Sequence, residues 1–169
     1  MENIIQATKL TKIYGEKETS VTALDNVDVQ FNENEFTAIM GPSGSGKSTL
    51  LHCLAGLDRP TSGQIFLKDQ DISTLNDKQL TKIRRDSFGF VFQAFNLIPT
   101  LTAEENITLP ASISGKKPDM DWIKQVVETV EIGDRLTHRP NELSGGQQQR
   151  VAAARAMATK PEVIFADEP

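Results

Sequence analysis

The stretch that decides the fold reads Gly41-Pro42-Ser43-Gly44-Ser45-Gly46-Lys47-Ser48. It satisfies every position of the pattern G-x-x-x-x-G-K-[ST], whose glycines let backbone N–H groups turn inward around phosphate oxygens. The apolar run 36–40 precedes it and predicts a short strand buried on both faces. Residues 47–55 follow it as a predicted helix, with Leu50, Leu51 and Leu54 on one face. Strand, loop and helix in this order predict a phosphate site at the start of the helix.

The loop supplies the groups that a nucleoside triphosphate and its metal require. We expect Lys47 to reach the β- and γ-phosphates, and to have no structural use in the free loop. The hydroxyl of Ser48 is the expected Mg²⁺ ligand. The alternative, a Gly/Ser turn that happens to precede a lysine, fits the flanking strand and helix poorly. The predicted nucleotide-binding residues of this segment are Gly41, Pro42, Ser43, Gly44, Ser45, Gly46, Lys47, Ser48 and Thr49.

Two acidic residues follow an apolar run at the other end of the sequence. Asp167 comes directly after residues 163–166, which we predict to form a strand. A carboxylate in this setting holds Mg²⁺ in nucleoside triphosphatases. Glu168 comes next, and a second carboxylate there can polarise the attacking water. Taken alone, the pair could equally be two solvated acids at a strand end, and it is the phosphate loop that favours the catalytic interpretation.

Between these motifs lies a third, Leu143-Ser144-Gly145-Gly146-Gln147. Ser144 and Gln147 have the spacing of a capping box for the Ala-rich helix that we predict over residues 146–158. A Ser-capped helix start with two glycines also offers free N–H groups to a phosphate. We expect both interpretations to hold together.

The chain as a whole has the composition of a globular protein. It has 169 residues, 38% of them hydrophobic and 24% charged, which suggests one domain with a substantial core. The net charge of −5 argues against a nucleic-acid partner, whose phosphates would need a basic face. Cys53 is the single cysteine, so no internal disulfide can form, and we interpret it as a small buried residue. We expect a cytoplasmic protein, because no apolar run has the length of a membrane span and no secretory signal opens the chain.

The remaining sequence predicts how the elements are arranged. Further strands are expected at residues 4–10, 21–31, 64–67 and 88–92. Further helices are expected at residues 75–85, 102–109 and 119–131. We therefore predict an α/β fold, in which a phosphate-loop core with a parallel sheet carries an N-terminal antiparallel β part and a helical insertion. Within this single domain, we assign residues 1–93 to the core, 94–145 to the helical subdomain and 146–169 to the return to the core.

With the three motifs in this order, the chain resembles the ATPases of ATP-binding cassette (ABC) transporters over essentially its whole length. The resemblance implies that Tyr14 stacks on adenine, with packing at a strand end as the alternative. It also implies that Gln93 contacts Mg²⁺ and the water, and hinges the helical subdomain. The implied catalytic residues are Glu168, Lys47 and Gln93, and the implied metal ligands are Ser48, Gln93 and Asp167.

The same resemblance implies two partners. A second copy of the ATPase domain would face the first head to tail and cover its ATP with the residues Ser144, Gly145, Gly146 and Gln147. A transmembrane permease would hold the protein at the inner face of the membrane. The permease would contact the chain near Gln93, where the apolar residues Phe95, Leu97 and Ile98 are candidates for this contact. Packing inside the helical subdomain explains these three side chains equally well.

Three stretches resemble one branch of this family. Residues 88–102, 138–142 and 165–169 are similar to the ATPases of macrolide exporters, lipoprotein-release complexes and antimicrobial-peptide efflux systems. Chains of the family continue past the position of Pro169 to a switch histidine, so we expect a C-terminally truncated chain that binds nucleotide but hydrolyses it slowly. The alternatives are a soluble ABC-type ATPase that acts on nucleic acid or ribosomes, and a nucleotide-binding module that does not hydrolyse.

Overall fold

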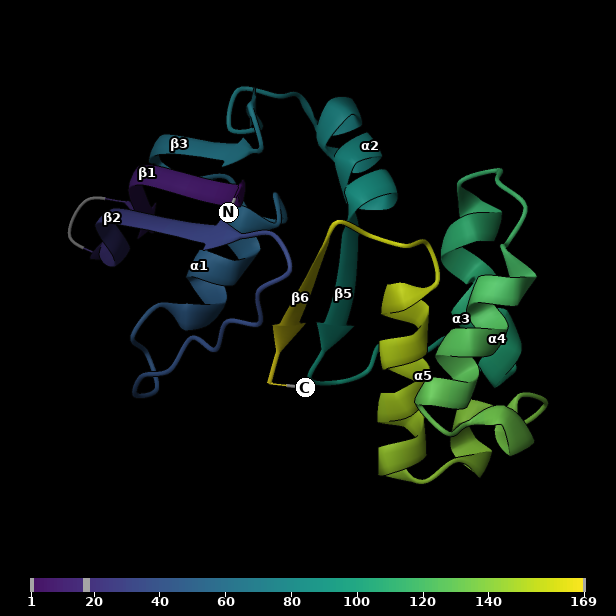
Figure 1. Ribbon diagram of the computed structural model, residues 1–169. Helices are drawn as coiled ribbons and strands as arrows, with labels where there is room; N and C mark the ends of the chain where they lie inside the picture. The colour runs from purple at the N-terminus through teal and green to yellow at the C-terminus, as the bar shows by residue number, and fades with distance from the viewer. Residues whose placement is uncertain (1, 17–18, 169) are drawn as a thin grey trace. The chain divides into compact units, whose positions relative to one another are not determined.

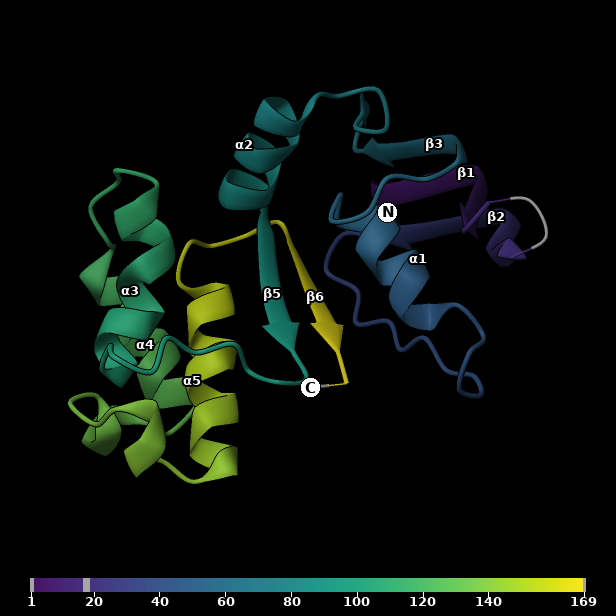
Figure 2. The same cartoon turned by 180° about the vertical axis from the view of Figure 1, so that it is seen from behind.

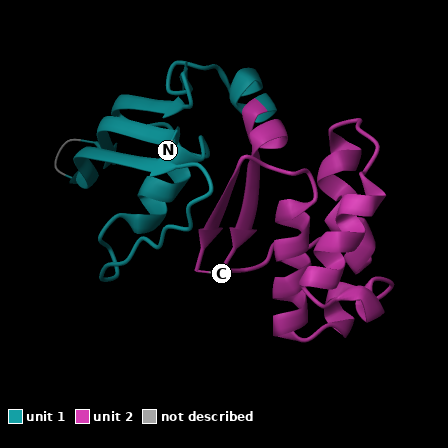
Figure 3. Cartoon of the chain, viewed as in Figure 1, with its two compact units in different colours: residues 1–82 teal, residues 83–169 magenta. Residues whose placement is uncertain are grey.

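The computed structural model describes residues 2–16 and 19–168, and the chain divides into two compact units. Unit 1 comprises residues 1–82 and unit 2 comprises residues 83–169 (Figure 3). Each unit has its own sheet and its own buried side chains. The predicted division at residues 93/94 and 145/146 stays a prediction. In the described part of the chain, no helix is both long enough and apolar enough to cross a membrane.

Unit 1 contains an antiparallel sheet (Figure 1). Its strands, in the order β2-β1-β3-β4, are β1 (Asn3–Tyr14), β2 (Val21–Asn32), β3 (Ser62–Leu67) and β4 (Gln70–Asp71). β1 lies between two partners, so that Ala7 is paired with Val29 on one side and with Ile65 on the other. Ile5, Ala7 and Ile65 are buried, so they lie on the face of the sheet that points into the core. The predicted antiparallel part is confirmed, and its two long strands extend beyond the predicted ends.

Helix α1 (Lys47–Leu54) packs on this sheet and completes the core of unit 1 (Figures 1 and 2). Cys53 and Leu54 of the helix are buried, as are Leu10 of β1 and Leu24 of β2. Burial raises the pKa of the Cys53 thiol to about 11, so this residue is a neutral, small packing group, as predicted. A second helix, α2 (Asp77–Ser87), begins and ends two residues later than predicted.

Residues 36–40 do not form the predicted strand. The segment has no regular secondary structure, and the side chains of Phe36 and Met40 are 96% and 88% exposed. An apolar run takes up strand geometry only when a neighbouring strand satisfies its backbone N–H and C=O groups. The described strands of unit 1 pair with one another and none pairs with this segment. The prediction from hydrophobicity alone is therefore wrong, because hydrophobicity does not supply a pairing partner.

A parallel pair of strands forms the sheet of unit 2. These are β5 (Phe88–Phe92) and β6 (Val163–Asp167), and their register runs from Phe88 opposite Val163 to Phe92 opposite Asp167. The rings of Phe88 and Phe165 pack edge to face across the pair, with centroids 5.1 Å apart, a favourable geometry for aromatic side chains. The predicted parallel sheet is confirmed for these two strands.

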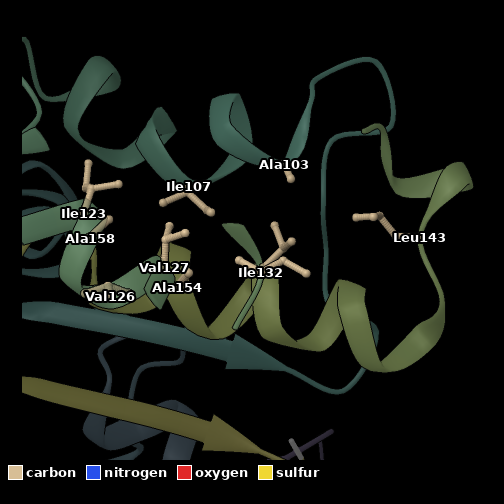
Figure 4. Close-up of a cluster of buried hydrophobic side chains, with 10 residues drawn as sticks. Ala103, Ile107, Ile123, Val126, Val127, Ile132, Leu143, Ala154 and Ala158 are labelled. Atoms are coloured by element: carbon tan, nitrogen blue, oxygen red, sulfur yellow. The ribbon is translucent and has the colours of Figure 1, made fainter. Parts of the chain in front are cut away.

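Three helices complete unit 2. They are α3 (Ala103–Ile113), α4 (Met120–Thr129) and α5 (Gly145–Met157), with the short 3-10 helices η2 (Gly133–Arg135) and η3 (Pro140–Glu142) before α5. Helix α5 lies between β5 and α3 (Figures 1 and 2). Figure 4 shows the buried cluster, to which Ile107 of α3, Val127 of α4 and Ala154 of α5 contribute. The helix predicted at residues 119–131 is confirmed as α4, and Trp122 and Val130 are partly buried against the cluster.

Asn106 of α3 is a fully buried polar side chain with its hydrogen bonds satisfied. Its Oδ1 accepts from the backbone N–H of Ile98 at 2.7 Å. Its Nδ2 donates to the carbonyl oxygens of Ile98, Leu101 and Thr102 at 3.1, 3.2 and 2.9 Å. One side chain therefore fixes the loop that leads from β5 to α3.

Replacing Asn106 with alanine should destabilise unit 2. The substitution removes the Asn106 partner of the Ile98 N–H and of the Leu101 carbonyl, whereas the Ile98 and Thr102 carbonyls keep a backbone N–H. Each part-buried group left without a partner costs about 1–3 kcal/mol. We expect the free energy of unfolding to fall by about 3 kcal/mol in total. Urea denaturation followed by the fluorescence of Trp122, the single tryptophan, measures this loss. Thr108→Ala is the matched control on the same helix, and an equal loss in both variants would contradict the role of Asn106.

Candidate active site

The glycine loop of unit 1 connects residue 40 to α1 and is largely exposed. Gly44 and Gly46 have φ angles of +78° and +87°, which side-chain-bearing residues rarely adopt. A Cβ on Gly46 would lie 2.5 Å from the carbonyl oxygen of Ala23, so only glycine permits this approach to β2. Gly46 is also the N-cap of α1 and makes no side-chain cap, so the first N–H groups of the helix can serve an anion. The loop therefore fits a phosphate.

Lys47, the first residue of α1, folds back over this loop. Its Nζ donates to the carbonyl oxygens of Gly41 at 2.9 Å and Pro42 at 2.8 Å. The expectation that the free loop makes no structural use of Lys47 is therefore wrong, because the ammonium closes the loop on itself. A phosphate group is negatively charged and would compete favourably with these two carbonyl dipoles for the same ammonium. Ser48 and Thr49 follow in the first turn of the helix.

Tyr14 ends β1 and reaches the same helix. Its hydroxyl donates to Asp58 Oδ2 at 2.6 Å and also hydrogen-bonds Thr49 of α1. The hydrogen bond to Asp58 raises the pKa of the Tyr14 phenol. The side chain is 41% exposed, so core packing alone does not describe it. Within unit 1, Tyr14 thus lies beside Thr49 in the first turn of α1.

In unit 2, three predicted site residues meet at the carboxyl edge of the parallel pair. Phe92 lies opposite Asp167, the last residue of β6, and Gln93 and Glu168 are the next residues of the two strands. The pairing ends at Phe92 and Asp167, so Gln93 and Glu168 each follow directly after the last paired residue of their strand. Glu168 is exposed and has a φ of +48°, where the strand ends. An amide and two carboxylates at one edge form an oxygen-rich set that suits hydrated Mg²⁺.

The motif at residues 143–147 lies at the start of α5. Ser144 is the N-cap of the helix, and its Oγ accepts from the N–H of Gln147 at 3.3 Å while Gln147 Oε1 accepts from the N–H of Ser144 at 2.9 Å. The predicted capping box is confirmed. Gly145 and Gly146 are exposed, and a Cβ on either would meet nothing within 4 Å. The backbone here is open to a ligand from outside the chain, whereas the Gln147 side chain is already engaged in the cap.

Arg155 of α5 is a positioning residue that the sequence reasoning missed. Its Nη1 donates to the carbonyl oxygen of Asn96 at 2.6 Å and its Nη2 to that of Phe95 at 2.7 Å. Both loop residues have left-handed φ angles, +56° for Phe95 and +47° for Asn96. Burial lowers the pKa of the Arg155 guanidinium. The two guanidinium hydrogen bonds of Arg155 therefore hold the turn that follows Gln93. The sequence shows only an arginine within an Ala-rich helix, which does not reveal these partners.

The apolar residues of this turn divide between the two predicted roles. Leu97 packs against the buried helical cluster, which agrees with an internal role. Ile98 is exposed, which leaves it available to a partner.

Comparison with known proteins gives the family. The family model described as ABC transporter matches residues 24–169. An uncharacterised ABC transporter ATP-binding protein of Thermotoga maritima is 48% identical over 171 residues, covering 100% of this chain and 73% of its own length. The solved dimeric ABC transporter cassette MJ0796 of Methanocaldococcus jannaschii matches 96% of this chain and 73% of its own, with a TM-score of 0.88 and 46% identity.

Two named transport proteins are also similar. The macrolide export ATP-binding/permease protein MacB of Marinobacter nauticus is 46% identical over 168 residues, which are 98% of this chain and 26% of MacB. The lipoprotein-releasing system ATP-binding protein LolD of Idiomarina loihiensis is 44% identical over 168 residues, 98% of this chain and 74% of LolD. The chain therefore belongs to the ABC transporter family, as an ATP-binding ATPase subunit. The branch predicted from residues 88–102, 138–142 and 165–169 is confirmed.

Proposed function

We propose that the chain binds Mg²⁺-ATP and hydrolyses it to drive an ABC membrane transporter, in efflux or in the movement of a lipid or peptide. The observation that carries the proposal is the glycine loop of unit 1, where Gly44 and Gly46 open the backbone to an anion beside Lys47. Two relatives support it: a structure of MJ0796 holds ADP and Pi, and MacB and LolD are named for macrolide export and lipoprotein release.

In this proposal residues 41–49 bind the phosphates and Tyr14 stacks on adenine. Lys47 exchanges its two carbonyl partners for phosphate oxygens and neutralises charge that develops on the γ-phosphoryl group. Ser48, Gln93 and Asp167 are the proposed Mg²⁺ ligands, and the bound metal supplies further charge neutralisation there. Glu168 orients the attacking water in line and accepts its proton, and Gln93 contacts the same water.

The proposed partners are a second copy of this domain and a permease. Ser144, Gly145, Gly146 and Gln147 of one copy would cover the ATP of the other through their backbone N–H groups, which the exposed glycines permit. The dimeric state of the MJ0796 structures supports this arrangement. Phe95, Leu97 and Ile98 are the proposed contact region for a permease, which would hold the protein at the inner face of the membrane.

A binding titration beside a single-turnover assay tests the proposal. We expect Mg²⁺-ATP to bind with a dissociation constant between about 1 μM and 1 mM, and single-turnover hydrolysis to be slow but measurable. No binding in this range would contradict the proposal, and binding without any cleavage would favour a non-hydrolysing module. Retention on DNA, RNA or ribosomes at physiological salt would favour the nucleic-acid alternative, which the net charge of −5 opposes.

A further inference from the structure

Asp58 joins two side chains of β1 by short hydrogen bonds. Its Oδ2 accepts from the Tyr14 hydroxyl at 2.6 Å, and its Oδ1 accepts from Lys12 Nζ at 2.6 Å. Lys12 also donates to the carbonyl oxygen of Arg59 at 2.7 Å. The Lys12 side chain is only 12% exposed and that of Asp58 is 31% exposed, so this ion pair is better shielded than an ordinary surface pair.

The same lysine covers one side of the aromatic ring. Lys12 Nζ lies 4.7 Å from the centroid of the Tyr14 ring, within the range of a cation–π contact. The hydroxyl end of the ring is held by Asp58 and by Thr49 in the first turn of α1. An exposed tyrosine would otherwise sample several rotamers, and fixing it in advance removes that entropy cost from ligand binding. The exposed part of the ring is therefore presented in one orientation beside the phosphate-binding helix.

We propose that Asp58 and Lys12 are positioning residues for the Tyr14 ring, and that they set how strongly the site prefers a nucleotide over a bare triphosphate. The proposal rests on the proposed function, in which Tyr14 stacks on the base. Neither residue needs to touch the nucleotide. Asp58 holds the ring by its hydroxyl, and Lys12 holds Asp58 and one ring face, which leaves the opposite face to the base.

The test compares two ligands that share their phosphates. ATP and inorganic tripolyphosphate are titrated into the chain with Mg²⁺ by calorimetry, and stacking should make ATP bind about tenfold more tightly. Asp58→Ala should weaken ATP binding about fivefold, which corresponds to the net contribution of one ordinary hydrogen bond. It should leave tripolyphosphate binding unchanged. Asp58→Asn retains an acceptor and should recover part of the loss. Tyr14→Ala should abolish the preference for ATP.

The outcomes separate this inference from the proposed function. If the unsubstituted chain binds both ligands equally, stacking on Tyr14 is wrong. If it prefers ATP and Asp58→Ala keeps the full preference, the positioning role is wrong. An equal loss for both ligands would mean that Asp58 only supports the fold, which also overturns the inference.

Tyr14 offers an independent readout, because it is the single tyrosine of the chain. The hydrogen bond to Asp58 raises the pKa of its phenol, so ultraviolet titration of the chain reports that contact directly. The pKa should fall toward its ordinary value in Asp58→Ala, with the far-ultraviolet circular dichroism unchanged. If the titration curve of Asp58→Ala is the same as that of the parent chain, the hydrogen bond between Tyr14 and Asp58 is contradicted.

Discussion

Lys47→Ala should lose about a hundredfold or more in ATP affinity, because it removes two or more charge-assisted hydrogen bonds to phosphate. The structure adds a second effect of the same change. In the free chain Lys47 Nζ ties the carbonyl oxygens of Gly41 and Pro42 together, so the variant also loses the contacts that close the loop. Calorimetric titration with Mg²⁺-ATP measures the affinity. An unchanged dissociation constant would contradict the interpretation of residues 41–48 as a phosphate-binding loop.

The loss must be separated from general damage to unit 1. Lys78→Ala is the matched control, since Lys78 is an exposed lysine of α2 outside the loop. It should keep both the ATP affinity and the stability of the parent chain. Amide hydrogen exchange without nucleotide should be faster across residues 41–46 in Lys47→Ala than in the control, because the free loop is less restrained. Equal exchange would show that the two carbonyl contacts do not restrain the loop.

Features with a local physical cause were predicted from the sequence. The capping box at Ser144 and the loop glycines depend on residues only a few positions apart, so their spacing carried the information. The strands β5 and β6 were predicted by their apolar runs, and a parallel sheet was part of the predicted fold class, although the pairing of these two strands was not predicted. Gln93 directly follows β5 and Asp167 ends β6, which agrees with the Mg²⁺ contact that the family resemblance implied for both residues.

Features that depend on distant partners were not predicted. The run 36–40 is apolar enough for a buried strand, yet strand formation needs a neighbour that no sequence pattern supplies. Arg155 acts on the backbone carbonyls of Asn96 and Phe95, which lie 59 and 60 positions away. The partners of Asn106 lie only 4 to 8 positions away, but they are backbone groups and so leave no side-chain pattern in the sequence. Asp58 lies in a turn where an acidic residue is unremarkable, and its 2.6 Å bond to Tyr14 spans 44 positions.

Glu168→Gln should bind ATP like the parent chain and cleave it about a hundredfold more slowly or worse, the usual contribution of a general base. The amide keeps the size and the hydrogen-bonding shape of the side chain and loses only its capacity to accept a proton. Because Glu168 is exposed at the end of β6, the substitution should cost little stability. Single-turnover hydrolysis with Mg²⁺-ATP measures the rate.

The same variant tests the head-to-tail pairing. When cleavage is blocked, ATP remains bound between the loop of one copy and Ser144 to Gln147 of the other, so the ATP-bound dimer should accumulate. Size exclusion with light scattering in Mg²⁺-ATP should then give a dimer for Glu168→Gln and less dimer for the parent chain. Glu128→Gln, an exposed substitution on α4, is the control and should match the parent in rate and in mass. A Glu168→Gln chain that stays monomeric while saturated with ATP would contradict the head-to-tail pairing. Hydrolysis at the parent rate would show that Glu168 takes no part in the cleavage step.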